Sequence, residues 1–258
     1  MKKGSYNCHF IGNVNNPKVV LIHGMGFYWE KCFTPIIEAL ELEYCLIIPE
    51  LEGHHNKSEK TDIKIADCVN RLEQELTSNN IKQVDVVYGI SFGASIAAEF
   101  ACNGKIKVNN LILDGAMFVD QGLMSWFSAL IMAWQFKRIL SDKPMFSYIK
   151  KQMGYTTKDE ITILKPLMCN PISFQTLRKS AYECYRYDIT KKNKIESNVR
   201  FIYGSGESFP AQSEEIIAGC TPKLINSKIY DNKGHAEILS CYPEILLKIF
   251  YIVNNYNN

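Results

Sequence analysis

The stretch Val84-Asp85-Val86-Val87-Tyr88-Gly89-Ile90-Ser91-Phe92-Gly93 decides the fold of this chain. Its mostly apolar, β-branched residues 84–88 predict a buried strand, and the apolar segment 91–101 predicts the helix that follows. Gly89, Ser91 and Gly93 match the pattern G-x-S-x-G at the junction. A strand-to-helix turn this tight forces unusual backbone angles on the serine and leaves room only for small neighbours. The turn therefore lifts the Ser91 hydroxyl above the sheet edge and aims the helix N-terminus at any oxyanion formed there.

Other strands and helices alternate along the chain on both sides of this stretch. Short apolar runs predict further strands at 18–22, 44–48, 108–113 and 199–203, with a weaker candidate at 223–230. Apolar residues at helical spacing predict helices at 61–77 and from Pro243 onward. Strands buried on both faces and alternating with helices are typical of a mostly parallel sheet in a doubly wound α/β architecture.

The alternation fails between Ala116 and Asn198, where the pattern indicates several helices separated by prolines. We therefore expect an α/β core made of residues 1–116 and 199–258, with residues 117–198 inserted as a helical cap. The cap is rich in apolar side chains, and we predict Trp126 and Trp134 to bind substrate. For most of these side chains, a lid helix packing on the core is an equally good interpretation. The cap also holds 13 basic and 7 acidic residues, a pattern more typical of a solvated helix face than of a site for anions.

Composition excludes several classes of protein. The chain has 258 residues, of which 47% are hydrophobic and 22% charged, as in soluble globular proteins. A net charge of +2 gives no basic excess of the kind that nucleic-acid binders carry. Nine cysteines, none of them in a C-x-x-C pair, indicate neither a zinc knuckle nor a thioredoxin-like site. We expect a cytoplasmic protein without a signal peptide or a transmembrane segment, because no apolar run suits either.

A second motif makes the pattern specific. His23-Gly24-Met25-Gly26 follows the first apolar strand and matches the HGxG oxyanion loop of the alpha/beta hydrolase superfamily. With the motif at Ser91, the chain resembles a serine hydrolase of that superfamily, carboxylesterase- or lipase-like, over residues 18–240. The resemblance implies a mostly parallel central sheet flanked by helices, with an inserted helical cap. It also assigns the oxyanion donors to the backbone N–H groups of Met25 and Phe92, and a bracing role to His23.

The base that activates Ser91 is predicted to be His235. It lies in Lys233-Gly234-His235-Ala236-Glu237, after the last strand and before the closing helix, where the resemblance places the catalytic histidine. Imidazole suits this task because its pKa lies near neutrality, so the ring can accept and return a proton in one cycle. His54 and His55 form a pair, but no metal-binding spacing accompanies them, and we predict no metal site.

The third member of the predicted triad is an acid that orients His235. The strand at 199–203 runs into Gly204-Ser205-Gly206-Glu207, and the family usually has Asp where this chain has Glu207. Glutamate is an accepted variant, and the order Ser91, Glu207, His235 is that of the alpha/beta hydrolases. Asp114, at the end of another strand, is the runner-up, and Asp231 ranks third.

These residues predict a serine hydrolase that cleaves carboxylic esters of small or medium apolar acyl groups through an acyl-enzyme, with no metal or organic cofactor. The expected partner is a small-molecule ester, and the sequence does not indicate an oligomeric state. Thioesterases, lactonases, carbon–carbon bond hydrolases and aminopeptidases share this triad. A non-catalytic small-molecule receptor on the same fold is the alternative from another class. Dehalogenases and epoxide hydrolases are disfavoured, because the resemblance places Asp at their nucleophile position.

Overall fold

Parallel strands form the centre of the molecule. The computed structural model describes residues 7–55, 63–155, 159–223 and 225–255, and within these ranges seven strands form one sheet in the order β1-β3-β2-β4-β5-β6-β7. Only β1 runs antiparallel to its neighbour. The strands are β1 (Cys8–Ile11), β2 (Lys18–Ile22), β3 (Cys45–Pro49), β4 (Gln83–Ile90), β5 (Lys107–Asp114), β6 (Asn198–Gly204) and β7 (Asn226–Tyr230). This sheet confirms the predicted α/β fold class.

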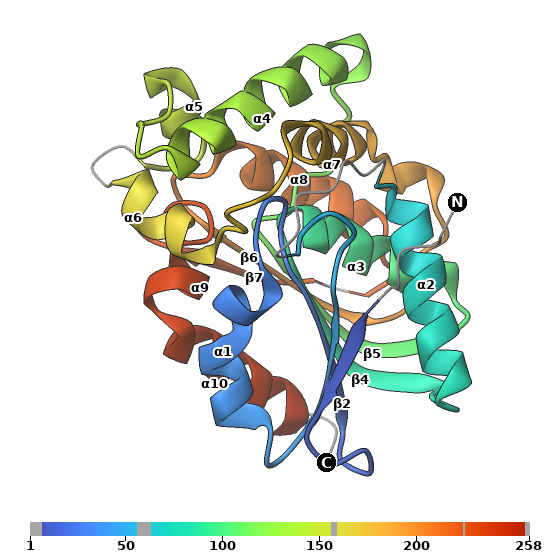
Figure 1. The fold of residues 1–258 in the computed structure, drawn as a ribbon. Helices are drawn as coiled ribbons and strands as arrows, with labels where there is room; N and C mark the ends of the chain where they lie inside the picture. The colour runs from blue at the N-terminus through green and yellow to red at the C-terminus, as the bar shows by residue number, and fades with distance from the viewer. Residues whose placement is uncertain (1–6, 56–62, 156–158, 224, 256–258) are drawn as a thin grey trace, which may run out of the picture.

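Helices cover both faces of the sheet, and this is why the central strands are apolar on both sides. Helices α1 and α10 lie together on one face, and α2 and α3 lie on the other (Figure 1). The helices outside the cap segment are α1 (Trp29–Leu40), α2 (Ile65–Ser78), α3 (Phe92–Asn103), α8 (Ser208–Gly219), α9 (Glu237–Cys241) and α10 (Pro243–Asn255). The predicted helix 61–77 corresponds to α2, although residues 61 and 62 lie outside the described ranges.

The connection from β5 to β6 is helical in its described residues. It holds η1 (Gly122–Met124), α4 (Ser125–Leu140), α5 (Ser147–Gln152), α6 (Glu160–Leu164), η2 (Lys165–Leu167), α7 (Phe174–Arg186) and η3 (Ile189–Lys191). Helix α4 packs against α7, and α7 contacts α3, so these helices form a layer beyond one end of the sheet (Figure 1). The division of the chain into a core and a cap domain at residues 117 and 198 remains a prediction.

The carboxyl ends of the parallel strands all meet beneath this helical layer. Register places Ile90 of β4 beside Asp114 of β5, and Gly204 of β6 beside Tyr230 of β7. The loops that leave these strand ends therefore converge on one edge of the sheet. In open α/β sheets this edge is where ligands bind.

Candidate active site

The turn between β4 and α3 holds Ser91 in a strained conformation. Ser91 has φ 56° and ψ −120°, a region that residues with a side chain rarely adopt. Its N–H donates a 2.8 Å hydrogen bond to the carbonyl of Asp114, which ties the turn to the end of β5. A Cβ atom on Gly89 would lie 2.3 Å from the Gly93 carbonyl oxygen, and one on Gly93 would lie 2.3 Å from that of Ile22. Only glycine fits at either position, as the G-x-S-x-G pattern requires.

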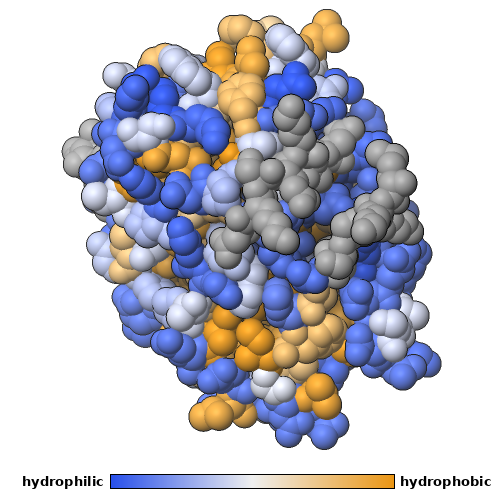
Figure 2. All heavy atoms as spheres, in the orientation of Figure 1, coloured by the Kyte–Doolittle hydropathy of each residue, from blue (hydrophilic) through white to orange (hydrophobic). Residues whose placement is uncertain are grey.

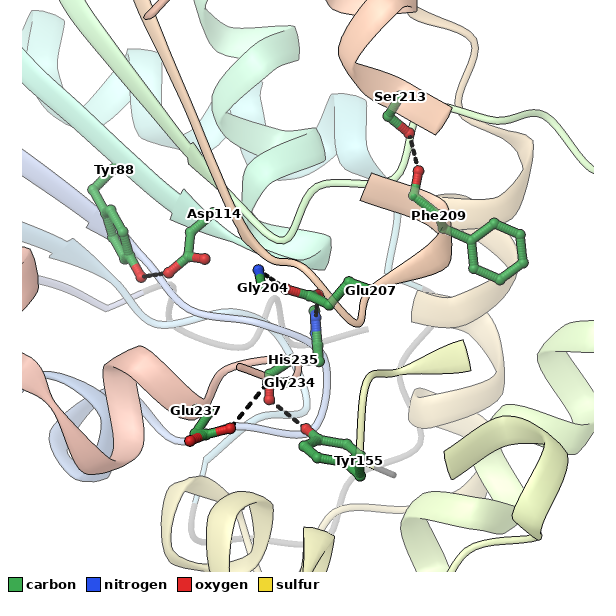
Figure 3. A network of polar contacts seen from close by, with 10 residues as sticks. All are labelled: Tyr88, Asp114, Tyr155, Gly204, Glu207, Phe209, Ser213, Gly234, His235 and Glu237. Atoms are coloured by element: carbon green, nitrogen blue, oxygen red, sulfur yellow. Dashed lines mark hydrogen bonds and ion pairs between the residues drawn. The ribbon is translucent and has the colours of Figure 1, made fainter. Parts of the chain in front are cut away.

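His235 and Glu207 form a buried pair. The Nδ1 atom of His235 lies 2.6 Å from Oε2 of Glu207, and the other carboxylate oxygen accepts a 2.8 Å hydrogen bond from the Gly204 N–H (Figure 3). Both residues are less than 10% exposed. A Cβ atom on Gly115, whose φ is +54°, would lie 2.8 Å from His235 Nδ1. Because Gly115 has no Cβ atom, there is room beside it for the side chains of His235 and Glu207.

The Glu207 carboxylate controls the protonation of His235. Burial alone lowers the pKa of the imidazole, but the charge of Glu207 and its hydrogen bond raise that pKa above the ordinary 6.5. When Nδ1–H donates to Glu207, the neutral ring presents Nε2 as its acceptor. Ser91 and His235 face the same cavity, although among the described residues no hydrogen bond joins the Ser91 hydroxyl to the ring. Such contacts are commonly long in unliganded sites and tighten when substrate binds.

The two other acids proposed from the sequence do not contact His235. The buried Asp114 carboxylate accepts a 2.7 Å hydrogen bond from the Tyr88 hydroxyl instead (Figure 3). Burial raises the pKa of Asp114 to about 7, against the opposing effect of the Tyr88 hydrogen bond. Asp231 is exposed in the turn after β7. Of the three acids, Glu207 is the one whose side chain is bonded to His235.

The loop after β2 is braced by His23. Its fully buried ring hydrogen-bonds through Nδ1 to the Gly24 carbonyl at 3.0 Å, and its Nε2 accepts from the Leu51 N–H at 3.5 Å. Burial lowers the pKa of His23 to about 3, which keeps the ring neutral. In the described part of the chain, the backbone N–H groups of Met25 and Phe92 donate no hydrogen bond. Both residues line the same cavity as Ser91, so two unoccupied backbone donors are available beside the serine.

That cavity lies between the sheet edge and the helical layer. Its lining is apolar apart from Ser91, His235, Glu207, Gln152, Cys184 and the phenol of Tyr185. In the part of the chain that the structure describes, no lysine, arginine or aspartate lines it. The residues outside the helical layer that line it are Met25, Ser91, Phe92, Gly115, Glu207, Phe209, Pro210 and His235, and those from the segment between β5 and β6 are Met117, Met132, Phe136, Gln152, Met153, Ala181, Cys184 and Tyr185.

Comparison with known proteins agrees with the α/β fold. A family model described as the alpha/beta hydrolase fold matches residues 17–145. A solved structure of a Desulfitobacterium hafniense protein, described as belonging to the alpha/beta hydrolase family, is similar at 35% identity and a TM-score of 0.93, covering 96% of this chain and 99% of that one. The chain belongs to the alpha/beta hydrolase family.

More distant structures share the fold of this hydrolase. An enol-lactonase from Burkholderia xenovorans is 13% identical, with a TM-score of 0.74 over 97% of this chain and 96% of that one. A structure from a study of carboxylesterases in Nitrososphaera gargenis is 19% identical, with a TM-score of 0.70 over 97% and 95%. At these identities the likeness concerns the fold alone. No curated protein is similar enough to this hydrolase to count as a match.

The structure brings neither of the predicted cap residues to the cavity of the hydrolase. Trp126 and Trp134 are 55% and 44% exposed. The Trp134 ring packs against Phe146, with ring centroids 4.9 Å apart, and against the Arg138 guanidinium. Both tryptophans lie on the outer face of α4, because that helix turns its opposite face, with Met132 and Phe136, toward the cavity.

A segment that sequence reasoning missed holds the histidine loop of the hydrolase. The His235 N–H donates a 2.9 Å hydrogen bond to the Met153 carbonyl. The fully buried Tyr155 hydroxyl donates to the His235 carbonyl (Figure 3). Between them, Gly154 has φ +82°, and a Cβ atom there would lie 3.0 Å from the backbone of both Gly206 and Gly234. Residues 153–155 of the helical layer therefore contact the loops that carry both Glu207 and His235.

His54, of the pair His54 and His55, is buried in the fold and held by backbone contacts. His54 is buried, its Nδ1 hydrogen-bonds the Glu52 carbonyl at 2.9 Å, and burial lowers its pKa to about 4. Its ring lies 5.4 Å from that of His23, measured between centroids. Within the described ranges, no group of three or more His, Cys, Asp or Glu side chains is arranged to hold a metal ion. None of the helices in those ranges is both long and apolar enough to cross a membrane.

Proposed function

We propose that this hydrolase is a serine hydrolase that cleaves carboxylic esters of small or medium apolar acyl groups. The observation that carries the proposal is the buried contact between His235 Nδ1 and Glu207 Oε2 in the cavity that Ser91 also lines. A nucleophile, a base and an acid that orients the base are the three parts of a triad, and geometry rather than sequence position identifies it.

Each residue has a defined role in the proposed reaction. The Ser91 oxygen attacks the ester carbonyl carbon while His235 Nε2 takes the hydroxyl proton, and Glu207 holds the ring in the tautomer that leaves Nε2 free to accept it. The backbone N–H groups of Met25 and Phe92 donate to the oxyanion, each contributing ~3 kcal/mol to transition-state stabilisation. His235 then protonates the leaving alkoxide as the carbon–oxygen bond breaks, and water hydrolyses the acyl-enzyme by the same route.

The lining of the cavity supports a neutral, apolar acyl group. Met25, Met117, Met132 and Met153 contribute flexible thioethers, which adapt to acyl chains of different shape. Among the described residues, no cationic side chain lines the cavity to bind an anionic substrate, and the one lining carboxylate, that of Glu207, is engaged with His235 and Gly204. A free α-amino group would therefore find no unengaged carboxylate among the described lining residues, which argues against an aminopeptidase.

Two further expectations belong with this proposal. We propose that residues 117–198 act as a cap that closes the cavity, since half of the lining side chains come from this segment. We also propose a cytoplasmic location, to which the nine unpaired cysteines are suited because reducing compartments keep thiols free.

Turnover of an ester panel tests the function. Aryl esters from acetate to decanoate, thioesters and amino-acid anilides are assayed with wild-type protein and Ser91→Ala. We expect hydrolysis of the esters, with loss of kcat by several orders of magnitude in the variant and a residual rate no more than ~10³-fold above water. A folded Ser91→Ala protein with wild-type turnover would refute the assignment of Ser91 as the nucleophile. Preferential turnover of thioesters would instead assign the chain to the thioesterase class.

A further inference from the structure

Helix α4 is apolar on both of its long faces. The face toward the cavity carries Met132 and Phe136, with Ala129 and Ala133 fully buried beside them. The opposite face carries Trp126, Phe127 and Trp134, which are 44–55% exposed. A helix that is hydrophobic all round is normally buried all round. The apolar side chains on the outer face of α4 are therefore more exposed than those of a helix of this composition usually are.

Neighbouring segments enlarge this face into an outer patch. Seven of the twelve large hydrophobic side chains that are exposed in the described part of the chain fall within 26 residues of sequence, 123–148. They are Leu123, Met124, Trp126, Phe127, Trp134, Phe146 and Tyr148, with exposed fractions from 44% for Trp134 and Phe146 to 98% for Leu123. Figure 2 shows hydrophobic side chains along the upper rim of the molecule, over α4. Apolar residues gathered in this way mark an interaction site, whereas single exposed ones do not.

The charges around the outer patch are predominantly positive. Residues 123–151 contain five basic side chains and one acidic one, Asp142. Asp142 is paired with Lys165 and Lys150 with the buried Glu160, while Lys143 and Lys151 are exposed. The Arg138 guanidinium lies 5.3 Å from the ring centroids of both Trp134 and Phe146, so positive charge adjoins the aromatic rings directly.

We propose that the outer patch docks on an anionic lipid surface. Tryptophan, tyrosine and phenylalanine beside lysine and arginine form the side-chain set that lies in a membrane interface, with rings at the headgroup level and cations on the phosphates. A second copy of this chain is a poorer occupant, because a symmetric contact would set the same basic residues against one another. The inference does not depend on the proposed ester hydrolysis.

Tryptophan fluorescence measures the docking directly, because two of the three tryptophans are in the outer patch and the third, Trp29, is only 8% exposed. The full chain is mixed with vesicles of phosphatidylcholine alone or of phosphatidylcholine with 30% phosphatidylglycerol, and bound protein is also measured by sedimentation. We expect a blue shift of the emission and co-sedimentation with the anionic vesicles, both weakened by 0.5 M NaCl, which screens the charges. Equal binding to both vesicles without a salt effect would overturn the charge argument.

Two variants and a control complete the test. Leu123→Ser with Phe127→Ser removes exposed apolar area, and Lys143→Glu with Lys151→Glu reverses exposed charge. Each pair should weaken binding to anionic vesicles by about tenfold or more. Leu42→Ser, at a residue 86% exposed outside the outer patch, should bind as wild type. Unchanged binding by either pair would overturn the proposal. Light scattering gives a second way to overturn it. If wild type is a dimer and Leu123→Ser with Phe127→Ser is a monomer, the outer patch serves self-association.

Discussion

Tyr155 and His235 are joined by a hydrogen bond from the phenol of the first to the backbone carbonyl of the second. Because the His235 N–H also donates to Met153, the histidine backbone is held on both sides by one short segment of the helical layer. A side chain that transfers protons needs its position fixed by such supporting contacts. The structure thus makes Tyr155 a positioning residue for the candidate base.

Replacing Tyr155 by Phe should lower kcat by roughly tenfold or more while leaving KM nearly unchanged. The variant leaves the buried carbonyl of His235 without its donor, at a cost of ~1–3 kcal/mol, and frees the loop to move away from Glu207. The pH profile should shift as well, because the pKa of His235 depends on its contact with Glu207.

Tyr203→Phe is the matched control for this loop. The Tyr203 phenol is also mostly buried, but it donates to Glu214 on α8 rather than to the histidine loop. The control should lose some stability and keep its kcat. Equal kcat values for the two variants would show that Tyr155 has only a structural role.

Glu207→Gln should keep the fold but lower kcat by a factor approaching ~10⁴, because the amide can favour the wrong imidazole tautomer. Asp114→Asn should be comparatively mild, since the Asp114 carboxylate binds Tyr88 and not His235. Steady-state kinetics on both purified variants decides between the acids. The reverse pattern would make Asp114 the acid and Glu207 a loop residue.

The pH dependence of kcat/KM should follow the protonation of His235. The ring must be neutral to accept the serine proton, so the rate rises with pH through a midpoint above 6.5, the direction in which Glu207 raises the pKa. In Glu207→Gln, burial still lowers the pKa of His235, and of the two charges that raise this pKa only that of Asp114, which has the smaller effect, is left. The midpoint should therefore move to lower pH. A midpoint that is the same in wild type and variant would contradict the assignment.

Acid should destabilise the fold through His23 and His54. Their pKa values in the folded state are lowered to about 3 and about 4, so between pH 6.5 and 4 the unfolded chain binds protons that the folded chain does not. Stability is therefore fully present above pH 6.5 and is lost as the pH falls. At pH 5 each histidine should account for about 2 kcal/mol of lost unfolding free energy. Urea denaturation at pH 7 and pH 5 measures the loss, which should be smaller in His54→Gln; an equal loss in the variant would count against this origin.

Most of the sheet was predictable because its buried strands are continuous apolar runs. The predicted strand 18–22 has the bounds of β2, and the other predicted strands coincide with observed ones to within a few residues. Strand β1 was missed because an edge strand half exposed to solvent needs no such run. Helices α1 and α8 were also missed. The apolar face of α1, with Phe33 and Ile36, is present in the sequence, but Pro35 interrupts the helical pattern.

The candidate site could be predicted where a motif fixes backbone geometry, and not where it depends on which face of a helix turns inward. The turn at Ser91 and the loop at His23 are determined locally by their glycines. Trp126 and Trp134 could not be placed from the sequence, because α4 carries large apolar side chains on both faces and its sequence does not reveal the face toward the cavity. The hydrogen bond from Tyr155 to His235 joins residues 80 positions apart in the sequence, and no local sequence pattern predicts it.

Covalent labelling by a fluorophosphonate tests the proposed role of Ser91 most directly. The reagent phosphonylates a serine whose oxygen an adjacent base activates, and peptide mass spectrometry locates the adduct. The proposed triad predicts one adduct, on Ser91, that forms far more slowly in His235→Ala and does not form in Ser91→Ala. An unmodified Ser91 in the folded wild-type chain would contradict it.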